Sequence, residues 1–491
     1  MSTLGHAARL AVFWTTGFNL FRDVLQLGLT LTLARLLPPE AYGQFGLVST
    51  ILTLLTVLSF REFLSYTLQV RRDEDTHYQD HFTAGAVIQV GVFAAANAVA
   101  GVMWLVPGYR PAAPLLHAMS VLFLLDLASE FRVKMLERAL DWRRLRLLHA
   151  SGLVASASAS VTMAVTGWGA WSLLLPSLLV PVPFTLDLFI NAGWRPTWEW
   201  DRQRYGPVWR FGLARISSAS LVSASQAIES AVLVRQAGFA TLGFYSRAIG
   251  LANLTCQKMS SVLAQALYPV LTRIEPGSDQ YRRVSALMLR CVAWTVVPVA
   301  ALLTSLARPA VMALYGAQWL AAVPLVPWAL AAVGIASMTQ TSYWLLLAYQ
   351  QQRRCAIADA MRLAGICAGL LLVLPFGLAP YLACVAITQA VTFALVSYWL
   401  CQLEAMRLSA LVDAFVPSVV AALAGWGCAE VLVRVTGADD LLWTSVAYAA
   451  AFGLGYLVVL RIGFRNRLDE VLVYVPHAGP LLRALRLREA A

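Results

Sequence analysis

The sequence has 491 residues, of which 59% are hydrophobic and only 13% are charged. No soluble core could bury that much apolar surface, so most of the chain must be solvated by lipid. The net charge is +11, but the basic residues lie in short breaks between apolar runs, a pattern typical of membrane topology. Composition therefore excludes a soluble protein, and we expect no nucleic acid as a partner.

Apolar runs of roughly 20 residues, the length that spans a bilayer, follow one another along the chain. The first run lacks a short apolar core followed by a small-residue cleavage site, so we expect it to be retained as a helix. The fold class predicted is an all-α polytopic membrane protein. About fourteen transmembrane helices are expected, at residues 11–37, 42–70, 81–106, 114–134, 146–166, 170–191, 208–234, 242–272, 284–307, 318–347, 355–375, 379–402, 409–433 and 441–461.

Lys and Arg residues predict the orientation, because cytoplasmic segments carry an excess of them. With the N-terminus inside, 25 basic residues fall in inner segments. Only five fall in outer breaks: Arg35, Arg110, Arg235, Arg308 and Arg434. We therefore expect a multi-pass protein of the cell inner (cytoplasmic) membrane, with both termini cytoplasmic.

The longest inner break divides the predicted helices into two lobes. We expect an N-terminal lobe of six helices at 1–192, an inter-lobe loop at 193–207, a C-terminal lobe of six helices at 208–402, two additional helices within 403–463, and a basic cytoplasmic tail at 464–491. The alternation of basic and apolar residues in the tail suits an amphipathic helix on the anionic inner surface, and equally an ordinary solvated end.

An internal repeat supports two related lobes. Residues 35–45 and 235–245 align without a gap at an offset of 200, which places similar residues together in three pairs: Arg35 with Arg235, Gly43 with Gly243, and Phe45 with Tyr245. Each segment ends the first helix of its lobe, so the repeats run in parallel, as in transporters whose two lobes enclose a central path. The alternative is that any tight outer turn selects Gly and an aromatic residue.

Two stretches carry a resemblance to a known family. Residues 36–47 (LLPPEAYGQFGL) resemble the turn after the first helix of polysaccharide transporters, the Wzx-type oligosaccharide flippases of the multidrug/oligosaccharidyl-lipid/polysaccharide exporter superfamily. Residues 242–254 (LGFYSRAIGLANL) and 266–273 (ALYPVLTR) are similar to the eighth-helix segment of that family. The resemblance implies two six-helix lobes around a cationic cavity, with two additional C-terminal helices.

The resemblance also implies a function. The protein would flip polyprenyl-diphosphate-linked oligosaccharide repeat units from the cytoplasmic to the periplasmic leaflet for exopolysaccharide, capsule or O-antigen biosynthesis, by alternating access coupled to an ion gradient. Its expected partners are that lipid-linked oligosaccharide and membrane lipids. The polysaccharide polymerase and the chain-length machinery are candidate partners. We expect no cofactor and no metal.

Seven basic residues fall inside predicted helices, where a charge is costly unless it faces a cavity or a partner: Arg22, Arg61, Arg215, Arg247, Lys258, Arg290 and Arg362. A lipid diphosphate needs cations, and an ion-coupled cycle needs a carboxylate that can change its charge. The substrate-cavity candidates are Arg22, Arg61, Lys258, Arg247 and Arg215. The coupling or charge-pair candidates are Asp23, Glu62, Asp126 and Glu229.

Helical periodicity gathers several of these residues on polar stripes. One stripe comprises Arg215, Ser218, Ser225 and Glu229, another Arg247, Lys258, Ser261 and Gln265, and a third Asn19, Arg22 and Gln26. Structural alternatives stay open: pairs Arg22/Asp23 and Arg61/Glu62 bracing the first two helices, Lys258 and Glu229 pairing across the lobe interface, and a packing role for Asp126. Arg215, Arg290 and Arg362 lie within reach of the inner surface and would then be interface anchors.

Other functions remain open as well. A cation or drug antiporter of the same superfamily would need fewer basic residues in its cavity, and a lipid II flippase has the same architecture. A membrane-embedded enzyme of polysaccharide assembly is less expected, because the longest outer loop, around 307–318, is short and no metal triad, nucleophile elbow or Gly-rich phosphate loop occurs. We therefore expect no enzyme. The seven cysteines show no CxxC spacing and are expected to be small core hydrophobes.

Overall fold

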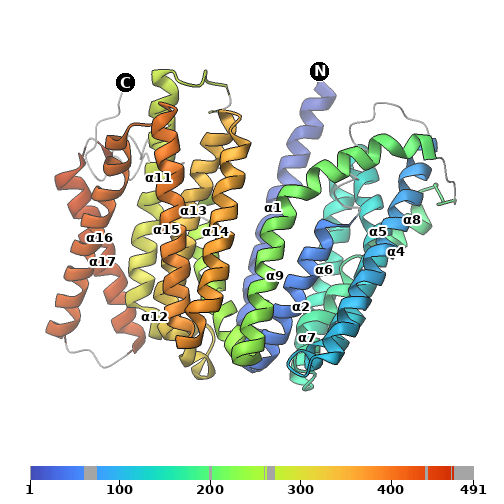
Figure 1. Cartoon of the computed structure of the whole chain (residues 1–491), viewed down its shortest axis with the longest axis horizontal. Coiled ribbons are helices and arrows are strands. Elements are labelled where there is room, and N and C mark those ends of the chain that lie inside the picture. Colours follow the sequence, from blue (N-terminus) through green and yellow to red (C-terminus); the bar gives the residue numbers. More distant parts are fainter. Residues whose placement is uncertain are drawn as a thin grey trace. The chain divides into compact units, whose positions relative to one another are not determined.

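The structure, a computed structural model, describes residues 2–59, 75–197, 202–258, 260–261, 271, 273–436, 441–465 and 467–468. In some helical stretches, residues 202–221 among them, the description covers the backbone alone. The described residues are almost entirely helical and contain no strand (Figure 1). They fall into two compact units, Met1–Gly243 and Phe244–Ala491.

Unit 1, residues Met1–Gly243, is built on three helix pairings: α1 with α6, α4 with α5, and α5 with α8. Figure 1 shows the last helix of this unit, α9, as a long curved helix that begins near α8. The elements are α1 (Ser2–Leu36), α2 (Pro39–Val57), α4 (Asp75–Leu105), η1 (Arg110–Ala112), α5 (Ala113–Arg138), α6 (Trp142–Val165), α7 (Trp171–Leu174), η2 (Leu175–Leu179), α8 (Val182–Asn191) and α9 (Arg202–Ala252).

Unit 2 begins within the last turns of α9 and packs α13 against α15 and α11 against α16. Its other close pairing is α16 with α17. The elements are η3 (Asn253–Gln257), α11 (Asp279–Ser305), α12 (Ala307–Leu314), η4 (Ala317–Leu325), α13 (Val326–Ala348), α14 (Gln352–Leu372), η5 (Leu374–Phe376), α15 (Leu378–Gln402), α16 (Leu408–Thr436) and α17 (Leu441–Gly463).

The expectation of an all-α polytopic membrane protein is confirmed. Each of the fourteen predicted segments coincides with helix in the described residues. Ten helices in that part of the chain are long and apolar enough to cross a membrane, and these ten do not include α1, α2 or α9. Two of the polar stripes predicted from the sequence lie on α1 and α9, outside these ten helices.

Prolines break two segments that the sequence predicts as single helices. The predicted helix 170–191 is divided into α7, η2 and α8, and Pro176 and Pro181 lie at the two junctions. The predicted helix 318–347 begins as η4, which contains Pro324, before α13 continues it. A proline ring clashes with the preceding helical turn and removes a hydrogen-bond donor, which favours a break at these positions, although α11 and α16 continue through Pro298 and Pro417.

The predicted helices 208–234 and 242–272 are joined in α9, which has one non-helical residue inside it, Gly238 (φ 82°, ψ 172°). Glycine adopts this positive φ without the steric penalty of a side chain, so the chain can change direction there. Past α9, residues Asn253–Gln257 form a π-helical turn. A π turn has more residues per turn than an α-helix, so the polar stripe calculated from Arg247 through Lys258 does not keep its α-helical register.

The turn between α1 and α2 packs against the C-terminal part of α9 within unit 1. Gly43 lies directly against the backbone of Phe239, and Gly243 lies against the backbone of Pro39. The side chains of Leu37, Tyr42 and Leu242 are almost fully buried around this contact. This packing explains why the boundary between the compact units follows Gly243, whereas the lobe boundaries predicted from the sequence stay predictions.

The two helices predicted as additional, α16 and α17, are held to the rest of unit 2 by hydrogen bonds to backbone carbonyl groups. Trp294 Nε1 on α11 donates to the carbonyl oxygen of Ala414 on α16 (3.0 Å), and Tyr456 Oη on α17 donates to the carbonyl oxygen of Trp294 (3.1 Å). Ser418 Oγ also lies 3.1 Å from Tyr456 Oη. All four residues are buried, so α16 and α17 are integral parts of this unit.

Candidate functional site

Two arginines approach each other where α1 packs against α6 in unit 1. Arg22, on α1, pairs with the adjacent Asp23 at 3.3 Å, and the two side chains are 40% and 33% exposed. Arg146, on α6, lies close enough to Arg22 for the two positive charges to repel each other. Like charges gathered on helices that belong to a membrane are costly, so such a pair is a functional-site candidate.

Aromatic rings and a hydroxyl contact the Arg146 guanidinium, and the nearby carboxylate of Glu137 stabilises its charge more strongly than Arg22 opposes it. Its Nη2 donates to Thr15 Oγ1 on α1 (3.3 Å), and its central carbon lies 5.3 Å from the centroid of the Phe18 ring and 5.8 Å from that of Trp142. The Nε of Arg146 is buried without a hydrogen-bond partner. Cation–π contacts stabilise the charge in part, but they leave donor groups unused.

His149 connects these aromatic side chains to Phe184 inside the unit. The His149 ring stacks on Phe18 at a centroid distance of 5.5 Å and meets the edge of Phe184, from α8, at 4.6 Å. His149 lies three residues after Arg146 on α6, so both side chains face α1. We call the group Thr15, Phe18, Arg22, Trp142, Arg146 and His149 the α1–α6 site.

A second charged cluster lies deeper in the same unit. Asp187 on α8 accepts hydrogen bonds from Arg132 Nε (2.6 Å) and Arg144 Nη2 (2.5 Å), and also from Asn191 Nδ2 (3.0 Å). The Arg132 and Asp187 side chains are only 8% and 6% exposed. Two guanidinium groups therefore share one buried carboxylate, which joins α5, α6 and α8 and leaves one positive charge in excess.

The structure brings only some of the predicted cavity residues into view. Arg61 and Glu62 lie outside the described residues, as does the side chain of Arg215. Arg247 is half-buried in unit 2, close enough to Tyr315 for its charge to act on that phenol, and Lys258 is exposed. These residues remain candidates, since nothing observed tests their role.

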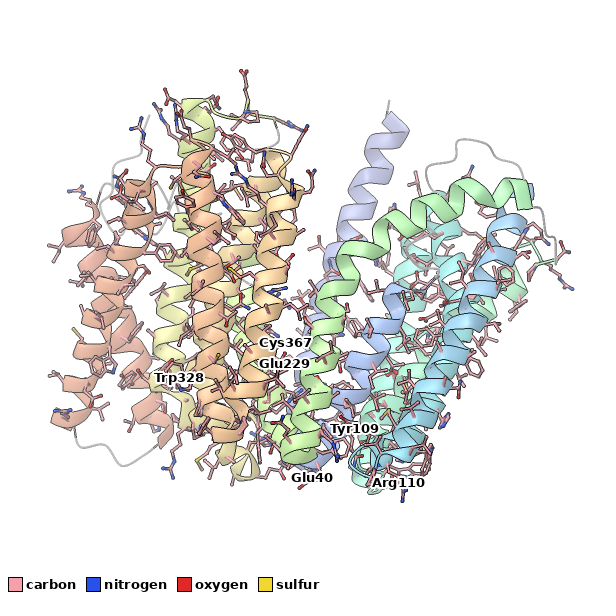
Figure 2. All side chains as sticks on the ribbon, viewed as in Figure 1. Glu40, Tyr109, Arg110, Glu229, Trp328 and Cys367 are labelled. Carbon is pink, nitrogen blue, oxygen red and sulfur yellow. The ribbon has the colours of Figure 1, made fainter. Side chains whose placement is uncertain are left out.

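The predicted acidic candidates lie at different depths of unit 1. Asp126 is half-buried on α5, and Glu229 is almost fully buried on α9, with 8% of its surface exposed. Figure 2 shows Glu229 on the lower half of α9, toward the end of the unit where Tyr109 and Arg110 lie. A carboxylate so enclosed is a suitable group for a proton-coupled step, so Glu229 stays a coupling candidate.

Two arginines expected as interface anchors differ from that expectation. Arg290 is only 4% exposed on α11, because α13 and α16 pack around that helix. Arg362 lies 3.3 Å from Asp359 on α14, and Tyr343 Oη donates to the same carboxylate oxygen (3.1 Å). Arg290 is therefore enclosed by protein, and Arg362 belongs to a charge pair.

Sequence reasoning missed Arg132, Arg144 and Arg146 as site residues. All three were assigned to an inner break because basic residues cluster between 132 and 146. The structure extends α5 to Arg138 and begins α6 at Trp142, so these side chains lie on helices. A usable signal was the carboxylate Asp187 in an apolar run, which had to find a cationic partner somewhere.

Metal and cysteine chemistry find no support in the described residues. No group of three His, Cys, Asp or Glu side chains there could hold a metal ion. The seven cysteines are free. Cys428 is exposed on α16 and so departs from the expected core role, whereas Cys256, Cys291 and Cys355 are buried as expected.

Helices of this number and apolarity, with buried charges held between them, define a polytopic membrane transporter. The chain matches the family model described as "Polysaccharide biosynthesis protein" over residues 32–324. It therefore belongs to that family of polysaccharide biosynthesis proteins.

Two curated relatives support this membership. The chain is 27% identical over 299 residues to the succinoglycan biosynthesis transport protein ExoT of Rhizobium meliloti (strain 1021), a match that covers 60% of this chain and 59% of that protein. It is 25% identical over 142 residues to the teichuronic acid biosynthesis protein TuaB of Bacillus subtilis (strain 168), covering 29% of each. The matches thus span less than two thirds of the length of either relative.

Two solved structures share the fold. The lipid II flippase MurJ in an inward closed conformation gives a TM-score of 0.73 at 12% identity, covering 93% of this chain and 100% of that chain. An inward-facing multidrug resistance transporter of the MATE family, in the MOP superfamily, gives 0.57 at 13% identity, covering 78% and 95%. These likenesses establish the architecture of a flippase and exporter fold.

Proposed function

We propose that this protein flips polyprenyl-diphosphate-linked oligosaccharide repeat units from the cytoplasmic to the periplasmic leaflet of the inner membrane, for surface polysaccharide biosynthesis. The observation that carries the proposal is the Arg22–Arg146 pair in the α1–α6 site. Two guanidinium groups near each other form the arrangement that a diphosphate recognises, because each can donate two parallel hydrogen bonds to phosphate oxygens.

The charge balance of the site favours an anionic cargo. Arg22 is offset by Asp23 at 3.3 Å, while Arg146 contacts Thr15 Oγ1 and aromatic faces directly and shares the nearby Glu137 carboxylate with Lys134. A diphosphate binding between them would satisfy the buried Nε of Arg146 and relieve its repulsion with Arg22. A cationic drug would meet two positive charges there, so the antiporter alternative is disfavoured.

Membership in a family of polysaccharide biosynthesis proteins supports the linked-oligosaccharide class. The name of ExoT specifies succinoglycan transport, and that of MurJ specifies lipid II flipping. We extend the lipid-linked oligosaccharide to this chain as substrate, with membrane lipids as its surroundings and a polysaccharide polymerase as a candidate partner. The protein performs no covalent chemistry in this proposal, and alternating access moves the cargo.

In this proposal, enclosed carboxylates couple transport to an ion gradient. Glu229 on α9 and Asp126 on α5 are the candidates, because a carboxylate held within a membrane helix can gain and lose a proton as access alternates. The Lys and Arg distribution supports a proposed orientation with both chain termini in the cytoplasm.

A flipping assay in inverted membrane vesicles or proteoliposomes tests the proposal. The readout is the fraction of a lipid-linked oligosaccharide that becomes accessible to a glycan-modifying reagent on the far leaflet. We expect Arg146→Gln and Arg22→Gln each to reduce flipping at least tenfold, the effect of losing one charge-assisted contact of about 1.5–3 kcal/mol. Arg61→Ala and Lys258→Ala should likewise abolish export at normal protein levels.

The matched control is Arg110→Gln, which removes an exposed arginine at the other end of unit 1 whose Nε donates to the Trp104 carbonyl oxygen. It should flip at the rate of the unaltered protein. Full flipping by Arg22→Gln and Arg146→Gln would overturn the site. In a deletion strain, repeat units should accumulate on the cytoplasmic leaflet, whereas absence of the linkage itself would indicate an enzyme.

A further inference from the structure

A cavity of about 450 Å³ opens at the start of α6, beside the ion pair of Arg144 with Asp187. It is lined by Asp141, Arg143, Arg144, Leu147 and Leu148. Two arginines and two leucines therefore face one hollow, and Leu147 is 50% exposed. A surface that offers cations beside exposed leucines matches an amphiphile better than a small ion.

The cations of this cavity are arranged in advance. Arg144 is fixed by its hydrogen bond to the buried Asp187, which Arg132 also contacts. Arg143 is exposed and makes no ion pair within the described chain. A held guanidinium loses less conformational entropy when it binds an anion than a freely moving one does.

The only carboxylate on the cavity wall is already engaged. Asp141 is the N-cap of α6, and its Oδ1 accepts a hydrogen bond from the backbone N–H of Arg144 (3.1 Å). Asp187 in turn is shared between Arg132 and Arg144. Three cationic side chains (Arg132, Arg143 and Arg144) thus stand against two anionic ones (Asp141 and Asp187). The cavity therefore keeps an excess positive charge that attracts an anion.

The place of the cavity along α6 indicates which anion it meets. The helix α6 is one of the membrane-spanning candidates, and the cavity lies at its first turns, where a spanning helix meets the headgroup region. Basic side chains beside the end of a membrane helix attract anionic lipid headgroups. The adjoining leucines lie where the first carbons of an acyl chain would run.

We propose that this cavity binds an anionic membrane phospholipid, with the headgroup phosphodiester on Arg143 and Arg144 and an acyl chain along Leu147 and Leu148. The bound lipid stabilises the junction of α5, α6 and α8 through Arg144 and Asp187. The site is independent of the transported cargo, and lipid retention can be measured without transport.

The test uses the full-length protein purified in a neutral detergent. It is mixed with phosphatidylglycerol or with phosphatidylcholine of the same acyl chains, and retained lipid is counted by native mass spectrometry. We expect preferential retention of phosphatidylglycerol, and an affinity about fivefold weaker in Arg143→Gln, the effect expected of one arginine near an anionic lipid. Arg144→Gln removes the other cation and leaves Asp187 paired with Arg132, so it should weaken retention similarly.

The matched control is Arg353→Gln. Arg353 is also an exposed arginine, followed by a second arginine, at the second residue of a membrane-spanning helix, α14. Its replacement should leave retention unchanged. Equal losses in Arg143→Gln and Arg353→Gln would reveal diffuse surface attraction and overturn the site, as would equal retention of the two lipids. Complete displacement by soluble glycerol phosphate would reduce the cavity to a phosphate site and reject the lipid.

Discussion

Gly43 and Gly243 make reciprocal contacts across the predicted repeat. A Cβ atom on Gly43 would lie 1.9 Å from the carbonyl oxygen of Phe239, and one on Gly243 would lie 2.1 Å from that of Pro39. At the repeat offset of 200 residues, Gly43 corresponds to Gly243 and Pro39 corresponds to Phe239, so the two contacts are equivalent. A relation in which i touches j and j touches i indicates local two-fold symmetry. This contact gives the weak sequence repeat a structural basis.

Gly43→Ala and Gly243→Ala should each destabilise the protein by about 1–3 kcal/mol, because an added methyl group must displace backbone and not a flexible side chain. Thermal unfolding in detergent measures this effect. Gly17→Ala in α1 and Gly91→Ala in α4 are the controls, since no atom lies within 4 Å of a Cβ at either position. The controls should be neutral or slightly stabilising; equal losses in all four variants would refute a specific contact.

Asp187→Asn should destabilise unit 1 strongly, by about 3–5 kcal/mol, because Arg132 would remain buried without its carboxylate. Glu430→Gln is the comparison: it breaks the surface pair of Glu430 with Arg434, 40% and 77% exposed, and should change stability by about 0.5 kcal/mol or less. Urea or thermal unfolding in one detergent would rank the two. A smaller effect at Asp187 than at Glu430 would contradict the buried cluster.

The Arg22 and Arg146 substitutions should be strongly non-additive in flipping. If both side chains hold one diphosphate, the double variant Arg22→Gln/Arg146→Gln should flip little more slowly than either single variant, because the first loss already disrupts the shared contact. Flipping rates of the four proteins complete the cycle. Multiplicative losses would indicate two separate roles. Arg146→Lys should restore only part of the rate, since lysine cannot donate in the fixed fork of a guanidinium.

Tyr109→Phe should lower stability by about 1 kcal/mol, because Tyr109 Oη donates to the carbonyl oxygen of Ala231 on α9 (3.1 Å). Burial raises the pKa of Tyr109 above its usual 10.0, and the Arg235 charge opposes that rise in part. A raised folded-state pKa means that the contribution is complete below about pH 10 and is lost as pH rises through the folded-state value. The difference between the two proteins should therefore shrink in strongly alkaline buffer. A stability difference that stays constant with pH would contradict the hydrogen bond from Tyr109 to Ala231.

The sequence was sufficient for the architecture because hydropathy acts locally. A run of apolar residues must form a helix in lipid wherever it lies, since no water can satisfy its backbone. Each predicted segment accordingly coincides with helix where the structure describes it, and the residues 36–47 and 242–254 indicated the family. Only details failed where local rules compete, as at Pro176 and Pro181, where rings interrupt a helix that hydropathy alone would continue.

What the tertiary structure decided is which charges meet. Arg146 and Arg132 looked like topology signals in a basic stretch, and only the packing of α6 against α1 and of α5 against α8 brought one to Arg22 and the other to Asp187. Electrostatic pairing depends on distances between residues far apart in the chain, which no local pattern encodes. Hydropathy fixed where the chain crosses the bilayer, and helix packing decided what each charged side chain can bind.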